Sequence, residues 1–244
     1  MNKIEDVLEN DENQVLALIK PRNVLKEIHF ITYMTFKRIL GFILACIGLI
    51  VASPVMAIIA IAIKLDSKGP VLFKQERTGY KGKVFKLYKF RSMAVNNDVH
   101  DFSKQDSHTK VGTFIRKTSL DELPQLFNIL NGTMAFIGPR PWITDYWDNM
   151  NFRERQRCDV VPGITGLAQA KGRNDISIFD KISYDLEYVE KYSLIEDIKI
   201  IFWTIKTVLS KKGADAGKST IQNELYDLMM ENGEEVDQVA KVIA

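Results

Sequence analysis

The apolar stretch ILGFILACIGLIVASPVMAIIAIAI spans residues 39–63, contains no charged residue and carries Ser53-Pro54 near its middle. A run of this length is long enough to cross a bilayer, since roughly 20 apolar residues suffice. A proline inside a helix removes a backbone hydrogen bond and kinks the helix axis. The Ser53 hydroxyl is placed to donate a hydrogen bond to a backbone carbonyl that Pro54 leaves free. Helices in membranes need such a replacement hydrogen bond, because no water is available there.

Both ends of this stretch are basic. Lys37 and Arg38 precede it, and Lys64 and Lys68 follow it. Segments rich in Lys and Arg tend to stay in the cytoplasm, so a straight span satisfies only one of the two flanks. Two basic flanks and a central kink are typical of a re-entrant helix, which enters the membrane, bends and returns to the same face. On these features alone, a kinked span and a re-entrant helix are equally compatible with the sequence.

The overall charge excludes the signature of a nucleic-acid-binding protein. The 244 residues include 33 Lys or Arg and 31 Asp or Glu, which gives a net charge of +2. Charge is concentrated in residues 64–91, where nine basic residues face two acidic ones, a net charge of +7. Such a block beside an apolar anchor suits anionic headgroups or phosphorylated ligands. Part of this positive charge is also explained by a basic flank that only keeps the chain on one side of the membrane.

The cysteines and histidines carry no visible chemistry. Cys46 and Cys158 are too few and too far apart for a disulfide framework, and the three histidines lack zinc-like spacing with them. A signal peptide is not expected, because about 36 partly acidic residues precede an apolar run that is too long for one. We therefore expect attachment to the cytoplasmic face of a membrane.

The remaining sequence predicts a mostly helical α/β unit. Two β-prone runs, 71–73 and 84–90, flank the turn-forming residues 78–82 and predict a β-hairpin. Further expectations are a polar loop at 94–110, a helical region at 111–134, a rigid turn at 138–141, a polar-aromatic helix with Trp142 and Trp147, a glycine-rich loop at 161–166, and helices at 178–191 and 194–210. The chain divides into an N-terminal arm (1–36), an apolar membrane segment (37–66), a folded domain (67–212) and an accessory tail (213–244) that we expect to form a helix.

The helix expected at 194–210 is amphipathic. One face carries Leu194, Ile198, Ile201, Phe202, Ile205 and Leu209, and the lysines lie elsewhere. Such a helix can lie in the membrane interface. A helix that faces a protein core has the same pattern.

Asp121-Glu122 is the first candidate for catalysis. Adjacent residues on a helix do not share a face, so the two carboxylates can serve different partners. One can attack an electrophile while the other binds a divalent cation, which prefers oxygen ligands. The competing interpretation is a capping box, because Ser119-Leu120-Asp121-Glu122 has the required spacing. Read in isolation, the capping box is the better match.

Several basic side chains lie beside turns, glycines or prolines rather than on charged helical faces. Planar guanidinium groups suit phosphate oxygens, so we predict a diphosphate site formed by Lys89, Arg91, Arg116, Arg140 and Arg173. Each arginine taken singly is equally explained by a surface ion pair. Asp185 and Asp197 are candidates for orienting an arginine or completing a metal shell, although solvated helical carboxylates are commoner.

Taken together, the motifs are familiar. Their order is Ser53-Pro54, KFRSM (89–93), SLDELPQLFNIL (119–130), FIGPRP (136–141), PGITGLAQAKGRN (162–174) and YDLEYV (184–189). Over about residues 37–212 the chain closely resembles the bacterial sugar transferases of the small monotopic polyprenyl-phosphate phosphoglycosyl transferase family. The resemblance implies a re-entrant helix broken at Ser53-Pro54 and a cytosolic α/β catalytic unit with helices at the membrane surface.

The resemblance also implies a reaction. Members move a sugar phosphate from a UDP-sugar to polyprenyl (undecaprenyl) phosphate and release UMP, in two steps through a covalent aspartyl-phosphosugar, and they require Mg²⁺. On this chain Asp121 matches the nucleophile, and Glu122 matches its partner at the metal. Lys89, Arg91, Arg116, Arg140, Arg173 and Asp197 fall on substrate-binding positions. The expected partners are the UDP-sugar, the polyprenyl phosphate and the bilayer; a homo-oligomer is compatible with the sequence, and nucleic acid is not expected.

Such a reaction starts a membrane-linked glycan such as capsule, exopolysaccharide or O-antigen. No motif in the chain identifies the sugar, although we favour an N-acetylated amino sugar. Two alternatives stay open at this point. A non-catalytic membrane adaptor would use the basic patch to bind anionic lipid, and a glycosyltransferase that breaks the sugar–phosphate bond would release UDP.

Overall fold

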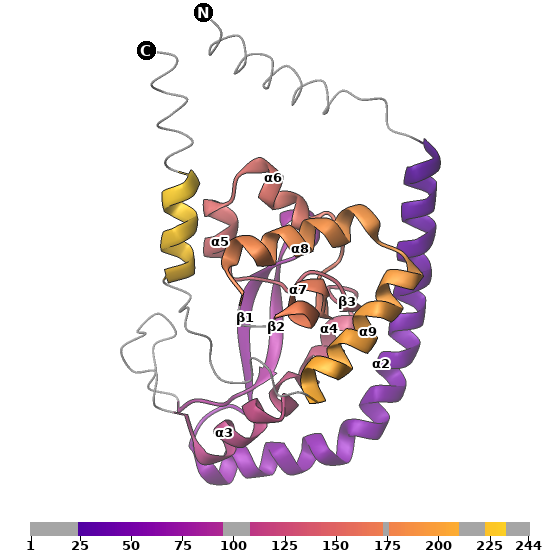
Figure 1. Cartoon of the computed structure of the whole chain (residues 1–244). Helices are drawn as coiled ribbons and strands as arrows, with labels where there is room; N and C mark the ends of the chain where they lie inside the picture. Colours follow the sequence, from indigo (N-terminus) through magenta and orange to yellow (C-terminus); the bar gives the residue numbers. More distant parts are fainter. Residues whose placement is uncertain (1–23, 95–107, 173–175, 210–222, 233–244) are drawn as a thin grey trace, which may run out of the picture.

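The structure is a computed structural model that describes residues 24–94, 108–172, 176–209 and 223–232. It is mostly helical and contains two small sheets. One long helix, α2 (Val24–Asp66), runs along the side of the other elements and then turns across the bottom of the view (Figure 1). Most of the predicted 94–110 loop, Arg173 and much of the accessory tail lie outside the described residues.

Helix α2 is bent and contains Pro54 (Figure 1). The proline cannot donate to the carbonyl four residues earlier, which belongs to Ile50. The Ser53 hydroxyl donates to that carbonyl at 2.8 Å, so the predicted role of Ser53 is confirmed. The helix begins at Val24, earlier than the expected residue 37, because Phe30 and Met34 pack against the core of the domain.

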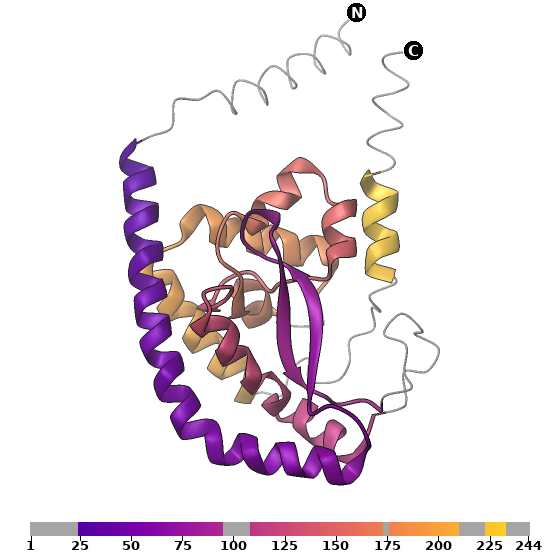
Figure 2. The same ribbon diagram turned by 180° about the vertical axis from the view of Figure 1, so that it is seen from behind.

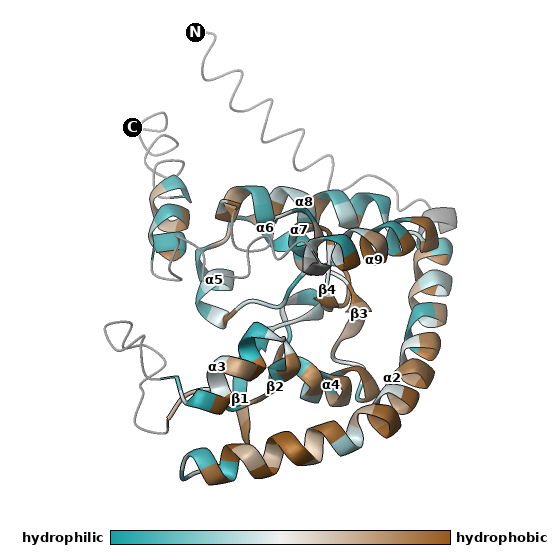
Figure 3. Cartoon of the chain, turned by 60° about the horizontal axis from the view of Figure 1, so that its bottom comes forward, coloured by the Kyte–Doolittle hydropathy of each residue, from teal (hydrophilic) through white to brown (hydrophobic). Residues whose placement is uncertain are grey.

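The apolar part of α2 is largely uncovered. Within the described residues, α2 is the one helix long and apolar enough to cross a membrane, with a window of mean hydropathy 2.7 of which 11% is buried. Figure 3 shows hydrophobic residues concentrated along the portion of α2 that passes beneath the other elements. Exposed apolar surface of this extent is unusual for a protein in water and is consistent with membrane association.

The predicted β-hairpin is confirmed. Strands β1 (Leu72–Thr78) and β2 (Val84–Phe90) pair antiparallel, joined by the short helix η1 (Tyr80–Gly82), and are best seen in Figure 2. Strand β1 extends beyond the expected 71–73, since its polar residues pair with β2. Gly82 has φ +76°, and a Cβ there would lie 2.6 Å from the Trp147 ring, so the turn requires glycine.

The helical region expected at 111–134 is divided into three pieces. They are α3 (Lys110–Lys117), η3 (Leu120–Gln125) and α4 (Leu126–Leu130). Ser119, between the first two, has a left-handed backbone with φ 57°, and Pro124 interrupts the hydrogen bonding of η3. The fully buried Asn128 then fastens α4 to β2, because its Oδ1 accepts from Tyr88 N (3.0 Å) and its Nδ2 donates to Lys86 O (2.8 Å).

A second sheet was not expected from the sequence. Strands β3 (Ala135–Ile137) and β4 (Gly163–Thr165) pair in parallel, and β4 lies inside the predicted glycine-rich loop. A Cβ on Gly163 would lie 2.2 Å from Gly138 N, so the glycines allow the two segments to approach closely. Strands of three residues are too short to show a periodic pattern.

Helices cover the remaining faces. After β3 come α5 (Thr144–Asn149), α6 (Phe152–Arg155) and η4 (Gln156–Cys158), and after β4 come α7 (Leu167–Lys171), α8 (Ile178–Lys191) and α9 (Leu194–Leu209). The two helices predicted at 178–191 and 194–210 are confirmed. On α9 the core-facing interpretation is wrong: Ile200 is buried, whereas an apolar set points outward, comprising Leu194, Ile195, Ile198, Ile201, Phe202 and Ile205.

The accessory helix expected in the tail is present at residues 223–232. Leu228 is fully buried and joins an apolar cluster with Tyr146 of α5 and Ile182 of α8. Glu224 accepts hydrogen bonds from the Tyr146 hydroxyl (2.9 Å) and from Lys181 Nζ (2.6 Å). The tail helix is therefore packed against the catalytic unit.

Replacing Leu228 with Ala is expected to destabilise the protein by about 2–4 kcal/mol, because it leaves a cavity in this cluster. The thermal unfolding midpoint of the detergent-purified protein measures the effect. Met229→Ala is the matched control, since Met229 is 51% exposed and its truncation should change little. Equal midpoints for the two variants would contradict the packing of the tail helix.

Candidate active site

Glu122 does not act in a capping box. Ser119 precedes η3 in the left-handed region, whereas residues that cap a helix normally have an extended backbone, and its side chain makes no capping hydrogen bond. The capping interpretation of Ser119–Glu122 is therefore wrong. The Glu122 carboxylate is free to turn toward β2 and the turn after β3.

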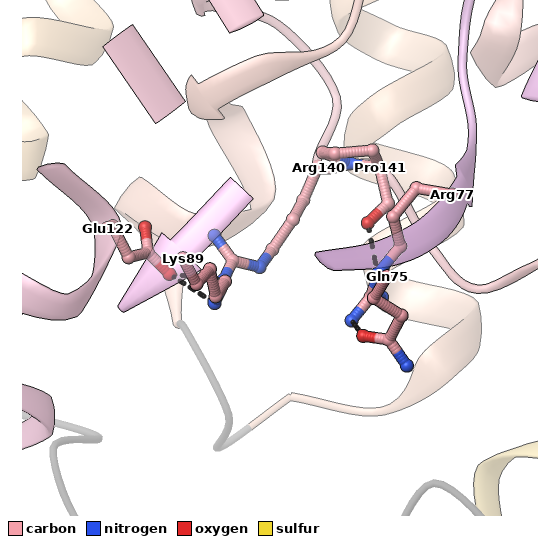
Figure 4. Close-up of polar contacts among 6 residues, drawn as sticks. All are labelled: Gln75, Arg77, Lys89, Glu122, Arg140 and Pro141. Carbon is pink, nitrogen blue, oxygen red and sulfur yellow. Dashed lines mark hydrogen bonds and ion pairs between the residues drawn. The ribbon is translucent and has the colours of Figure 1, made fainter. Parts of the chain in front are cut away.

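Two cations bind the same oxygen of Glu122. Lys89 Nζ, from β2, and Arg140 Nη2, from the 138–142 turn, approach Oε1 at 2.9 and 2.6 Å (Figure 4). Burial disfavours the ionised form, yet Arg140 and Lys89 together hold the pKa of Glu122 well below its usual range. Glu122 is therefore ionised at neutral pH, and three separate segments meet at one carboxylate.

Asp121 has the opposite electrostatic environment. Burial, reinforced by the nearby charge of Glu122, raises its pKa even though Lys89, Arg116 and Arg140 act against the shift. Asp121 is partly buried, so its ionised form is less well solvated than a surface carboxylate. A carboxylate in this state is more basic, which favours a role as a nucleophile.

The structure brings together four of the predicted site residues, Lys89, Asp121, Glu122 and Arg140, with Arg116 close enough to act on the charge of Asp121. Arg116 is exposed, and its Nη1 lies 2.8 Å from His108 Nε2. Arg173 lies outside the described residues.

Arg91 lies apart from this cluster. Its buried guanidinium donates to Lys68 O (2.6 Å), Ser67 O (2.8 Å) and Ser67 Oγ (2.8 Å). These bonds fasten the segment after α2 to the end of β2. Its predicted part in substrate binding has no support from this geometry.

Asp197 also lies apart from the cluster, in a buried polar network. Tyr33 Oη (2.7 Å) and Lys37 Nζ (2.6 Å), both on α2, bind its Oδ2, and Tyr188 Oη on α8 donates to its Oδ1 (2.7 Å). The network joins α2 to α8 and α9. The geometry thus assigns Asp197 to anchoring the long helix.

Two arginines near the site were not among the predicted site residues. Arg77 on β1 donates to Pro141 O at 3.4 Å and to Gln75 Oε1 at 2.5 Å (Figure 4), and burial together with Arg140 lowers its pKa to about 10. Arg157 is buried and binds Asp185, which confirms the expectation that Asp185 orients an arginine. The positively charged block at residues 64–91 contains Arg77 and could have indicated it as a site residue. No feature of the sequence around Arg157 indicates its position near the site.

The carboxylate pair fits a magnesium ion that is held partly by substrate. Among the described residues, no group of three or more His, Cys, Asp and Glu side chains forms a closed metal site. Mg²⁺ commonly uses one or two carboxylates, substrate phosphates and water instead. Glu122 offers its second oxygen, Oε2, because both cations bind Oε1. Glu122 is therefore the residue that would hold the ion, together with substrate phosphate and water.

The fold and the site define a membrane-associated protein with a carboxylate pair among cations that suit phosphate groups. The chain belongs to the bacterial sugar transferase family, whose sequence model matches residues 32–211. The family assignment made from the motifs is thus confirmed. The tail helix at 223–232 lies beyond the matched region.

Two relatives named as sugar transferases are more than 40% identical to this chain over the aligned residues. A UDP-glucose:undecaprenyl-phosphate glucose-1-phosphate transferase from Klebsiella pneumoniae is 46% identical over 186 residues, which cover 70% of this chain and 40% of that protein. The galactosyl transferase CpsE from Streptococcus agalactiae is 41% identical over 199 residues, 75% of this chain and 44% of that protein. The chain therefore spans less than half the length of these relatives.

A smaller relative matches over nearly its whole length. The sugar transferase EpsL from Bacillus subtilis, which is uncharacterized, is 42% identical over 183 residues, 74% of this chain and 90% of that protein.

Opposite pKa shifts in the carboxylate pair predict opposite stability effects. Because the pKa of Asp121 is raised on folding, its ionised form destabilises the fold at neutral pH, and Asp121→Asn should raise the thermal midpoint. That gain should shrink as the pH falls through the raised pKa, where the wild type becomes neutral.

Glu122→Gln should lower stability by roughly 1–3 kcal/mol at neutral pH through loss of two charged hydrogen bonds. Thermal unfolding across pH measures both, and destabilisation by Asp121→Asn at pH 7 would contradict the assignment.

Anchoring by Asp197 predicts a stability defect rather than a binding defect. Asp197→Asn leaves the Lys37 ammonium buried without its counter-charge, which should cost about 3 kcal/mol or more. Glu196→Gln is the control, because Glu196 pairs with Lys199 at an exposed position and should contribute little. An unchanged unfolding midpoint for Asp197→Asn, with weakened donor binding, would instead place Asp197 in the substrate site.

Proposed function

We propose that this chain transfers a sugar-1-phosphate from a UDP-sugar to polyprenyl (undecaprenyl) phosphate and releases UMP. The observation that carries the proposal is Asp121, a destabilised carboxylate, beside the ionised Glu122 and its two cations. Relatives named as undecaprenyl-phosphate sugar transferases, including the Salmonella typhimurium galactose phosphotransferase at 40% identity, support the substrate class.

The reaction proceeds in two displacements at one phosphorus atom. A carboxylate oxygen of Asp121 attacks the phosphorus that bears the sugar, and the bond from that phosphorus to the oxygen of the uridine phosphate breaks, so UMP leaves. An oxygen of the polyprenyl phosphate then attacks the aspartyl-phosphosugar, and Asp121 is released as a carboxylate. The sugar–oxygen bond stays intact throughout, and Asp121 in its ionised form needs no general base to attack phosphorus.

The cations prepare the phosphorus for attack. A diphosphate repels an anionic nucleophile, and positive groups aimed at its oxygens reduce that repulsion in the transition state. Arg140 and Lys89 are fixed by Glu122 and need little reorganisation to bind these oxygens. Arg116 adds positive charge near Asp121. A Mg²⁺ ion held by Glu122 would neutralise further phosphate charge.

Membrane attachment brings the two substrates to one site. The proposal places α2 as a re-entrant helix in the inner membrane, with the catalytic unit on the cytoplasmic face. The bend at Ser53-Pro54, the two basic flanks and the outward apolar face of α9 support this arrangement. Asp121 then meets a water-soluble donor and a lipid phosphate at headgroup depth. The product would start an exopolysaccharide, capsule or O-antigen.

Nucleotide release from a panel of UDP-sugars tests the proposal. With Mg²⁺ and polyprenyl phosphate, the wild type should form UMP from one donor, and Asp121→Asn should be slower by about 1,000-fold or more. UDP-glucose and UDP-galactose enter the panel because relatives carry those sugars in their names, and N-acetylated amino sugars enter as our first expectation. Asp159→Asn is the control, since Asp159 forms an exposed pair with Lys81.

Each other outcome supports a different function. Release of UDP would identify a glycosyltransferase that breaks the sugar–phosphate bond. Undiminished activity of Asp121→Asn would contradict the covalent intermediate. Absence of nucleotide release from every donor would favour the adaptor that binds anionic lipid.

A further inference from the structure

The turn that carries Arg140 is fixed at five consecutive residues. Pro139 and Pro141 have no N–H group, so the turn is held chiefly through its carbonyl groups. The bonds are Gly138 N to Thr165 O (2.9 Å), Gly163 N to Pro139 O (3.0 Å), Arg157 Nη2 to Arg140 O (2.7 Å), Arg77 Nη1 to Pro141 O (3.4 Å) and Thr78 N to Trp142 O (2.9 Å). Arg140 itself is thus held through Arg157.

Arg157 is oriented from two further sides. Its Nε (3.0 Å) and Nη2 (2.6 Å) both donate to Asp185 Oδ2, and both side chains are 2% exposed. Its guanidinium carbon lies 3.8 Å from the ring centroid of Trp142, a residue of the same turn. The guanidinium plane is thereby fixed, and one N–H is directed at the carbonyl of Arg140.

Stability alone is a poor explanation for this arrangement. Removing an Arg and an Asp from water costs free energy that their attraction often fails to exceed, and apolar residues would fill the same space at lower cost. The second oxygen of Asp185, Oδ1, is buried without a partner, which adds to that cost. What the pair supplies is a directed bond to one backbone carbonyl.

The consequence appears at the far end of the Arg140 side chain. Its Nη2 lies 2.6 Å from Glu122 Oε1, so a small rotation of the backbone would displace the guanidinium from the carboxylate (Figure 4). Displacements of about 1 Å can cost a hundredfold in rate when a group must meet a transition state. We propose that Arg157 is a positioning residue for the phosphate site and acts through Arg140. This inference rests on the proposed function, because it assigns Arg140 to phosphate binding.

A double-mutant cycle between Arg157 and Arg140 tests the proposal. Arg157→Lys keeps the charge but cannot reproduce the bonds to Asp185 and Arg140, and should lower kcat/KM for the UDP-sugar by about 10- to 100-fold. In an Arg140→Ala background the same change should have less than about a twofold further effect, because its target is already gone. The proposal would be overturned if the double variant lost the product of the two single-variant factors in kcat/KM. Full activity of Arg157→Lys would also overturn it.

Arg155→Lys is the matched control. Arg155 also stacks on a tryptophan, Trp147 at 5.2 Å, and also donates to a backbone carbonyl, Trp147 O at 3.1 Å. Both contacts join α6 to α5 rather than to the turn of residues 138–142. It should lose less than about twofold in kcat/KM. A loss equal to that of Arg157→Lys would show that any such stack matters and would overturn the proposal.

Two further measurements separate a failure of folding or of the reaction from a failure of the proposal. If Arg157→Lys does not fold, Asp185→Asn replaces it in the cycle; loss of folded protein in both would show that the pair serves the fold alone, against the proposal. Calorimetric binding of UDP-glucose and UDP-galactose to the four proteins of the cycle reads the coupling without turnover. A wild-type protein that binds the donor but forms no UMP would contradict the proposed function. The affinities would still test the role of Arg157: coupled losses in the cycle would support it, and independent losses would overturn it.

Discussion

The carboxylate of Glu122 joins three parts of the chain that are distant in sequence. Lys89 reaches it from the hairpin, Arg140 reaches it from the turn after β3, and Glu122 itself lies on η3 beside Asp121. Ionised and paired, it fixes the two cations while Asp121, its neighbour, stays without a comparable partner and keeps a raised pKa. Two adjacent carboxylates thus acquire opposite pKa shifts from their surroundings, and these shifts suit the separate roles proposed for them, a nucleophile and an electrostatic support.

The position of this cluster relative to the membrane depends on α2. The Ser53 hydroxyl compensates the carbonyl that Pro54 frees, so the helix bends without losing a partner in an apolar environment. At its other end the buried network around Asp197 fastens α2 to α8 and α9, and the apolar side chains of α9 point outward. In the membrane arrangement proposed above, Asp197 would therefore help to set the depth of Asp121 by anchoring α2.

The sequence predicted those features that leave a local pattern. The hairpin, the two long C-terminal helices and the role of Ser53 follow from periodicity and proline chemistry, and Lys89, Asp121, Glu122 and Arg140 lie together as the motifs implied. Strands β3 and β4 were not predicted, because a strand of three residues is too short to show a periodic hydrophobic pattern. The substrate-binding roles of Arg91 and Asp197 stay predictions. The tertiary contacts of Arg91 with Ser67 and of Asp197 with Tyr33 could not be predicted, because no local pattern encodes them. Arg157 was missed for the same reason.

The central claim is that Asp121 carries the sugar phosphate between the two substrates. Its most direct test is mass spectrometry of the wild-type protein after incubation with its UDP-sugar and Mg²⁺ in the absence of polyprenyl phosphate. We expect one added sugar phosphate on the peptide that contains Asp121. This adduct should disappear when polyprenyl phosphate is added. An adduct on another residue, or turnover without any adduct on this peptide, would contradict it.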